Sequence, residues 1–287
     1  MELLMIKKVG VVGCGQMGSG IVQVTAAAGF PVIANEATEE LLERGISGIE
    51  KRLAKAIEKG KMDEAAKDKL LGNIKTAVDL EELADCDIVI EAITEDINAK
   101  KEIFKDLDKI CKAETIFASN TSSIPIGDLA AITGRRDQFL GLHFFNPVPV
   151  MKLVEVVRSL DTSEASFNAA KEFAEKVGKV TVAAKDTPGF IVNVLLVPYL
   201  LDAVRQFENG LASRDDIDNA MKLGCGHRMG PLTLTDFIGL DTILFIADIF
   251  FDEFKNDHYA APPLLRRMVA AGYLGKKSGR GFYDYRQ

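Results

Sequence analysis

The segment VVGCGQMGSG constrains the fold of this chain more than any other. It places Gly13, Gly15 and Gly18 in a G-x-G-x-x-G pattern between an apolar β-like run and a helical pattern. The first glycine permits a tight turn, the second lets the backbone approach a pyrophosphate, and the third lets helix and strand pack closely. The pattern therefore predicts a phosphate cradle at the N-terminus of a helix.

One acidic residue supports a dinucleotide as the ligand of this cradle. Glu36 ends the second predicted strand, where a carboxylate can accept hydrogen bonds from an adenosine ribose. The same carboxylate repels a 2′-phosphate and so favours NAD over NADP, which stays possible. FAD also fits the glycine pattern, but the chain lacks the extra length that flavoproteins usually devote to the isoalloxazine. A glycine-rich turn without a ligand is the remaining alternative.

The order of apolar patterns predicts two domains. Up to residue 186, β-like runs alternate with amphipathic helical patterns, which is typical of an α/β fold with a mostly parallel sheet. Long apolar helical patterns then replace the strands as far as the C-terminus. We therefore predict an α/β domain over residues 1–186 and an all-α domain over residues 187–287.

The elements expected within these domains follow from the period of the apolar residues. The expected strands are residues 7–13, 31–36, 86–93, 114–120, 138–145, 152–157 and 180–184. The expected helices are residues 17–28, 42–57, 97–110 and 163–177, followed by a helical pattern over residues 190–204 that Pro198 should kink or break.

Composition excludes some classes of function. The net charge of −7 gives no electrostatic footprint for nucleic acid or an anionic membrane. The longest apolar run, residues 189–201, is too short to span a bilayer. The N-terminus leads directly into a predicted strand and leaves no room for a signal peptide, so we expect a cytoplasmic protein. The four cysteines lack C-x-x-C spacing, so we expect reduced thiols and no metal site.

One histidine lies among apolar residues in the stretch GLHFFNPVPVMKLVEVV. His143 ends a predicted strand of the nucleotide-binding half, and Glu155 belongs to the next strand, with NPVP between them to turn the chain. A histidine oriented by a carboxylate is a general base suited to an alcohol whose hydride leaves for a nicotinamide. The alternative is a core histidine bonded to a backbone carbonyl, and sequence spacing alone does not decide between them.

Each of the other candidate polar residues fits either a structural role or a ligand-binding role. Asn120 and Ser122 in SNTSS follow a predicted strand at the same sheet edge, although turn or capping roles suit them as well. Asn193 lies in an apolar helical pattern, where a buried amide needs a partner, either a helix-packing bond or a ligand between the domains. Arg52 and Lys55 belong to a basic helix whose cations form a solvated face or bind a polyanion.

The whole chain resembles the short-chain L-3-hydroxyacyl-CoA dehydrogenases. The segments that carry the resemblance, in order, are VVGCGQMGSGI, FASNTSS, GLHFFNPVPVMKLVEVV, DTPGFIVN, DIDNAMKLG, MGPLTLTDFIGLD and GKKSGRGFYDY. The resemblance implies a Rossmann-type N-terminal domain and a helical domain that binds substrate and forms a homodimer or higher oligomer. It also implies NAD-dependent interconversion of a short-chain 3-hydroxyacyl-CoA and its 3-oxo form, in butyrate or fatty-acid metabolism.

The resemblance also implies a role for individual residues. His143 matches the catalytic base and Glu155 its orienting partner, while Ser122 and Asn193 match the residues that hold the substrate oxygen. Lys55 matches a contact to the CoA phosphates, with Arg52 beside it. The positions that match the NAD site are Gly13, Gly15, Gln16, Met17, Gly18, Glu36, Glu95, Lys100, Asn120, Asn146 and Lys277. A dehydrogenase of a sugar acid or other hydroxy acid without CoA, or a non-catalytic NAD-binding protein, stays open.

Overall fold

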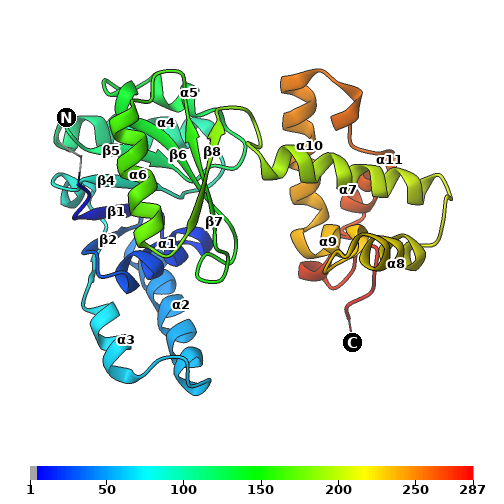
Figure 1. Ribbon diagram of the computed structural model, residues 1–287, viewed down its shortest axis with the longest axis horizontal. Coiled ribbons are helices and arrows are strands. Elements are labelled where there is room, and N and C mark those ends of the chain that lie inside the picture. The colour runs from blue at the N-terminus through cyan, green and yellow to red at the C-terminus, as the bar shows by residue number, and fades with distance from the viewer. Residues whose placement is uncertain (1–4, 287) are drawn as a thin grey trace. The chain divides into compact units, whose positions relative to one another are not determined.

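The computed structural model describes residues 5–286, which divide into two compact units between Thr187 and Pro188 (Figure 1). Residues 1–4 and 287, which the predicted domains include, lie outside the described residues. The first unit contains the sheet and the second is helical, which confirms the predicted fold class. Each unit has a hydrophobic core of its own.

The first unit is built on an eight-stranded sheet of order β3-β2-β1-β4-β5-β6-β7-β8. All neighbouring strands run parallel except β6 and β7, which are antiparallel. The central strands are fully buried and are apolar apart from Glu91 and Ser119 at their ends, as is typical of parallel strands covered on both faces. The strands are β1 (Val9–Val12), β2 (Val32–Asn35), β3 (Ile74–Ala77), β4 (Ile88–Glu91), β5 (Ile116–Ser119), β6 (Phe139–Phe144), β7 (Leu153–Arg158) and β8 (Val180–Lys185).

Helices pack against this sheet with the apolar faces that their periodicity predicts. Helix α2, for example, buries Leu42, Ile49 and Leu53, and the side chain of Thr38 caps its N-terminus by accepting a hydrogen bond from the Leu41 N–H. The helices are α1 (Gln16–Ala27), α2 (Glu39–Glu58), α3 (Glu64–Leu71), α4 (Ile97–Ile110), α5 (Ile126–Ala130) and α6 (Glu164–Lys176).

Among the strands and α-helices of this unit, three escaped the sequence analysis, namely α3, β3 and α5. Strand β3 lies at the edge of the sheet and buries only Ala77, so it lacks the apolar run by which the central strands were found. Helix α3 is similarly short and buries only Leu70. Helix α5 has just five residues, too few for a helical period to show in the sequence.

The second unit packs its helices around an apolar core that includes Leu201, Leu240 and Phe250. Pro198 was predicted to kink or break this helix, and the break is wrong, since α7 continues on both sides of it. A proline removes a single backbone donor, and the neighbouring residues Val197 and Leu201 are buried in the core, which holds the helix together. The helices are α7 (Val192–Glu208), α8 (Arg214–Cys225), α9 (Pro231–Ile238), α10 (Leu240–Phe254) and α11 (Pro263–Ala270).

Two of the sequence expectations concern membranes and thiols. Among residues 5–286, no helix combines the length and the apolar content needed to cross a membrane. The four cysteines are free thiols, of which Cys225 is exposed. Burial raises the pKa of Cys14 and Cys111 to about 11 and that of Cys86 to about 12, so these three are poor nucleophiles at neutral pH.

Candidate active site

The topology of the sheet gathers several polar side chains of the first unit at the carboxyl ends of its strands. Strands β1, β4, β5 and β6 are parallel, so their carboxyl ends lie together, where open α/β sheets bind ligands. Strand β7 runs the opposite way, and its first half therefore returns to that edge. The glycine cradle, Glu91, Asn120, His143 and Glu155 all lie at or next to these strand ends.

The geometry of the glycine cradle fits a pyrophosphate. Gly13 has φ +92°, and a Cβ added to it would lie 2.6 Å from the Ala92 carbonyl oxygen. A Cβ on Gly18 would lie 1.7 Å from the carbonyl oxygen of Gly13, whereas one on Gly15 would meet nothing within 4 Å. Gly13 and Gly18 thus make the tight turn, and Gly15 leaves an open face. Gly15 is also the N-cap of α1, so the first N–H groups of the helix border that face.

Glu36 follows β2 beside the cradle, and backbone donors hold its carboxylate there. Its Oε2 accepts from the N–H of Cys14 at 2.8 Å and its Oε1 from the N–H of Ala37 at 3.0 Å. A hollow of about 350 Å³ lies next to it, lined by Gly15 of the cradle and by residues of α2 that include Arg44. The carboxylate and the hollow together suit the adenosine half of a dinucleotide.

Two cations of α2 that the sequence singled out lie in different settings. The guanidinium of Arg52 lines the same hollow and donates to the Gln23 Oε1 at 2.7 Å and the Ser19 Oγ at 3.2 Å. Burial lowers the pKa of this guanidinium. Lys55, in the last turn of the helix, is exposed to solvent. Arg52 is therefore tied to α1, while Lys55 is available to a soluble ligand.

His143 and Glu155 face each other across β6 and β7 as register partners. The imidazole Nδ1 lies 2.6 Å from the Glu155 Oε2, and both side chains are buried. An ionised carboxylate only accepts hydrogen bonds, so beside one a neutral imidazole donates from Nδ1 and has its lone pair on Nε2. The Phe145 ring packs against the imidazole with centroids 4.5 Å apart. The partner of Nδ1 is thus a carboxylate and not a backbone carbonyl.

The loop after β5 carries two of the predicted site residues next to this pair. The side chain of Asn120 accepts a hydrogen bond from the N–H of Phe144 at 2.9 Å, which ties the loop to the end of β6. Ser122 donates its backbone N–H to the Glu95 Oε1 at 2.9 Å, and its Oγ lies 3.4 Å from the same oxygen. The loop is therefore fixed to β6 through Asn120 and to Glu95 through Ser122.

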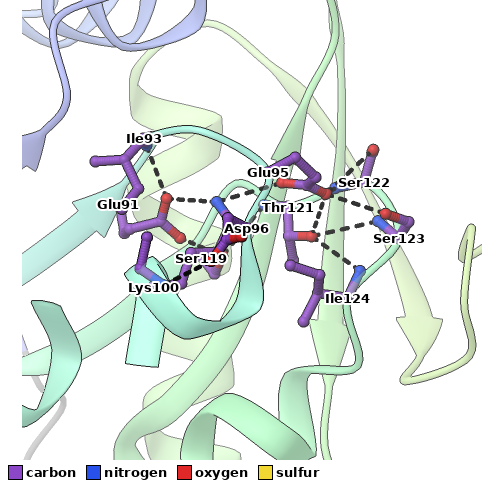
Figure 2. A network of polar contacts seen from close by, with 11 residues as sticks. Glu91, Ile93, Glu95, Asp96, Lys100, Ser119, Thr121, Ser122, Ser123 and Ile124 are labelled. Atoms are coloured by element: carbon purple, nitrogen blue, oxygen red, sulfur yellow. Dashed lines mark hydrogen bonds and ion pairs between the residues drawn. The ribbon is translucent and has the colours of Figure 1, made fainter. Parts of the chain in front are cut away.

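Lys100 is buried between two acids, one of which is the Glu95 that holds this loop (Figure 2). Its Nζ is 2.5 Å from the Glu91 Oε1 and 3.3 Å from the Glu95 Oε2. Burial raises the pKa of Glu91. At Glu95 burial has the same tendency, but Lys100 and the hydrogen bonds of the loop outweigh it, so the pKa of Glu95 is lowered. Asp96 caps α4, which carries Lys100, by accepting from the N–H of Ala99.

Glu91 is the residue of this site that the sequence analysis missed. It ends β4 and is fully buried in an otherwise apolar strand, IVIE. An acid at the carboxyl end of a buried central strand is itself an unusual pattern, because an ionised carboxylate is costly to bury without partners. That pattern is the signal by which the sequence could have revealed it.

The remaining predicted residues lie on loops and in the second unit. Asn146 is exposed in the connection between β6 and β7. Asn193 lies in the first turn of α7 and is half-buried. The helix begins later than the predicted pattern over residues 190–204, after residues 189 and 190, which have positive φ. Lys277 forms an ion pair with Asp241 at 2.6 Å within the second unit.

Known proteins resemble both units of the chain. The family described as "3-hydroxyacyl-CoA dehydrogenase, NAD binding domain" matches residues 8–187, and "3-hydroxyacyl-CoA dehydrogenase, C-terminal domain" matches residues 189–285. A 3-hydroxybutyryl-CoA dehydrogenase of Mycobacterium tuberculosis is 52% identical, covering 98% of this chain and 99% of the relative. The human mitochondrial hydroxyacyl-coenzyme A dehydrogenase is 47% identical, covering 99% of this chain and 92% of its own.

A solved structure shows the same fold over the full length. The crystal structure of (S)-3-hydroxybutyryl-CoA dehydrogenase from Ralstonia eutropha is 45% identical and aligns with a TM-score of 0.96, covering 98% of this chain and 100% of that one. The matches include both units, at identities well above those that show a fold alone. The chain therefore belongs to the 3-hydroxyacyl-CoA dehydrogenase family, with an NAD-binding domain followed by the C-terminal domain of that family.

Proposed function

We propose that this enzyme interconverts (S)-3-hydroxybutyryl-CoA and acetoacetyl-CoA, with NAD(H) as the hydride carrier. The observation that carries the proposal is the buried His143–Glu155 pair at the sheet edge where the glycine cradle opens. The names of the relatives support the substrate, since the M. tuberculosis and R. eutropha proteins are 3-hydroxybutyryl-CoA dehydrogenases. A cytoplasmic homodimer acting in butyrate or fatty-acid metabolism stays a prediction.

In this proposal His143 is the general acid and base. Glu155 holds the Nδ1–H, so Nε2 takes the proton of the 3-hydroxyl group. In the reverse direction the imidazolium returns that proton to the 3-oxo group. NAD held by the glycine cradle and Glu36 would supply the hydride chemistry at C3 of the substrate in both directions. The negative charge of Glu155 stabilises the imidazolium that forms when His143 takes the proton.

The family resemblance supports an assignment of the substrate and cofactor contacts to individual residues. Ser122 and Asn193 hold the reacting oxygen, which is the work of preorganised hydrogen-bond donors. Glu36 binds the adenosine ribose, and because backbone N–H groups hold its carboxylate in place, it disfavours the 2′-phosphate of NADP. The further proposed NAD contacts are Gly13, Gly15, Gln16, Met17, Gly18, Glu95, Lys100, Asn120, Asn146 and Lys277.

A spectrophotometric assay tests the proposed function. We expect the purified protein to oxidise NADH when acetoacetyl-CoA is added and to do so more slowly with NADPH. Free acetoacetate and sugar acids, which lack CoA, serve as the comparison substrates. Faster turnover of a substrate without CoA would assign the enzyme to a different dehydrogenase activity, and turnover of none of them would leave a protein that binds the cofactor without using it.

The proposed CoA site makes a separate prediction. Replacing Lys55 with Ala should raise the KM for acetoacetyl-CoA roughly two- to fivefold, because an exposed ion pair is worth up to about 1 kcal/mol. The KM for NADH should not change. Lys109→Ala, which removes an exposed cation from α4, is the matched control. Equal values of KM for Lys55→Ala and the unchanged enzyme would remove Lys55 from the substrate site.

A further inference from the structure

Five residues, Glu91, Lys100, Glu95, Thr121 and Ser119, form a closed ring of polar contacts, which Figure 2 shows from close by. Lys100 joins the two acids, as described above. The Ser119 Oγ donates to the Glu91 Oε2 at 2.7 Å and accepts from the N–H of Thr121 at 3.2 Å. The Thr121 Oγ1 donates to the Glu95 Oε1 at 2.6 Å, which closes the ring. Strands β4 and β5, helix α4 and two loops are thereby joined.

The ring is buried and carries unbalanced charge. Glu91 and Lys100 are at most 1% exposed, whereas the side chain of Glu95 is 27% exposed. Two carboxylates thus share one ammonium. A buried ion pair is weak support for stability, because apolar residues of similar volume often serve as well. The hydrogen bonds of the ring are more informative than its charge. The Glu91 carboxylate accepts from the backbone N–H of Ile93 as well as from the side chains of Lys100 and Ser119.

The ring reaches the proposed substrate contact through Glu95. The carboxylate oxygen that receives the Thr121 hydroxyl also receives the N–H of Ser122 and lies 3.1 Å from the Ser123 Oγ. Lys100 holds the other oxygen of this carboxylate. The position of Ser122 therefore depends on Glu95, and the position of Glu95 depends on where the Lys100 ammonium lies between its two acids.

We propose that Glu91 is a positioning residue for Ser122, acting through Lys100 and Glu95. Without the charge of Glu91, the ammonium moves toward Glu95, and the Glu95 carboxylate turns away from the N–H of Ser122 to meet it. A displacement of about 1 Å at a group that holds the reacting atom costs on the order of 10²-fold in rate. The inference rests on the proposed function, in which Ser122 holds the substrate oxygen.

A double-mutant cycle between Glu91 and Ser122 tests this. Glu91→Gln keeps the shape of the side chain and removes its charge, and we expect it to lower kcat for acetoacetyl-CoA reduction by roughly 10- to 100-fold. In a Ser122→Ala background the same change should lower kcat less than about twofold, because the group that it positions is gone. Glu102→Gln, which alters an exposed acid of α4, is the matched control and should change neither background.

The cycle separates positioning from a general structural role. If Glu91→Gln lowers kcat by the same factor in both backgrounds, Glu91 supports the fold and not Ser122, and the inference is wrong. Should Glu91→Gln fail to fold, Ser119→Ala takes its place in the same cycle, since it removes one hydroxyl from the ring. An unmodified enzyme that does not reduce acetoacetyl-CoA would overturn the proposed function and the inference with it, whereas normal turnover with additive effects overturns the inference alone.

Discussion

Replacing His143 with Gln is expected to lower kcat for acetoacetyl-CoA reduction by about 10²- to 10⁴-fold, the usual contribution of a general acid or base. A glutamine amide can still donate to the Glu155 carboxylate and fill much of the space of the imidazole, but it cannot carry a proton to the substrate. The buried pair should therefore keep its shape and lose its chemistry. Steady-state kinetics with NADH and acetoacetyl-CoA give the measurement.

The control for this variant is His258→Gln, because His258 is exposed in the second unit. We expect it to retain full turnover. NADH binding, followed by fluorescence, should be close to normal in both variants, since the cradle and Glu36 are unchanged. A His143→Gln enzyme that keeps more than half of its turnover would refute the assignment of the proton to this residue.

Replacing Gly18 with Ala is expected to weaken NADH binding by on the order of 100-fold. The new Cβ would lie 1.7 Å from the carbonyl oxygen of Gly13, so α1 and the turn that leads into it must move apart. Overpacking of this kind costs about 1–3 kcal/mol or more, and here the displaced atoms belong to the cradle itself. Fluorescence titration with NADH and thermal unfolding give the two measurements, and both should show a loss.

The matched control is Gly224→Ala in α8, where an added Cβ meets nothing within 4 Å. Alanine is the better helix former, so this variant should keep its NADH affinity and its melting temperature or raise the latter. If Gly18→Ala bound NADH with unchanged affinity, the cradle described above would not be the binding site.

The sequence predicted those parts of the fold whose burial repeats along the chain. The central strands were found because each is a continuous apolar run, and α4 was found over residues 97–110 because its apolar face recurs at helical spacing. Strand β3 and helix α3 bury one residue each, so neither shows an apolar pattern in the sequence. The sheet order and the reversal at β7 depend on contacts between distant segments, which periodicity does not encode.

The site residues that the sequence revealed are those that interrupt an apolar pattern. His143 and Glu155 were noticed because polar residues stood out in apolar strands, whereas Glu91 was passed over as the end of a strand. Glu95 and Lys100 came only from the family resemblance, since their shared ring is a matter of three-dimensional contact. In the second unit, Asp236 was not singled out, although it receives the backbone N–H groups of Phe282 and Tyr283.

Because β6 and β7 are antiparallel, the length of the connection between them decides whether the proposed catalytic pair shares one face of the sheet. Side chains alternate between the two faces of a strand, and His143 meets Glu155 because the two are register partners. Adding or deleting one residue in the connection 145–152 would either bulge the hairpin or shift its register by one, and such a shift turns Glu155 to the opposite face of the sheet. Substitutions in that connection keep the register, whereas a shift of the register by one residue separates the base from its acid.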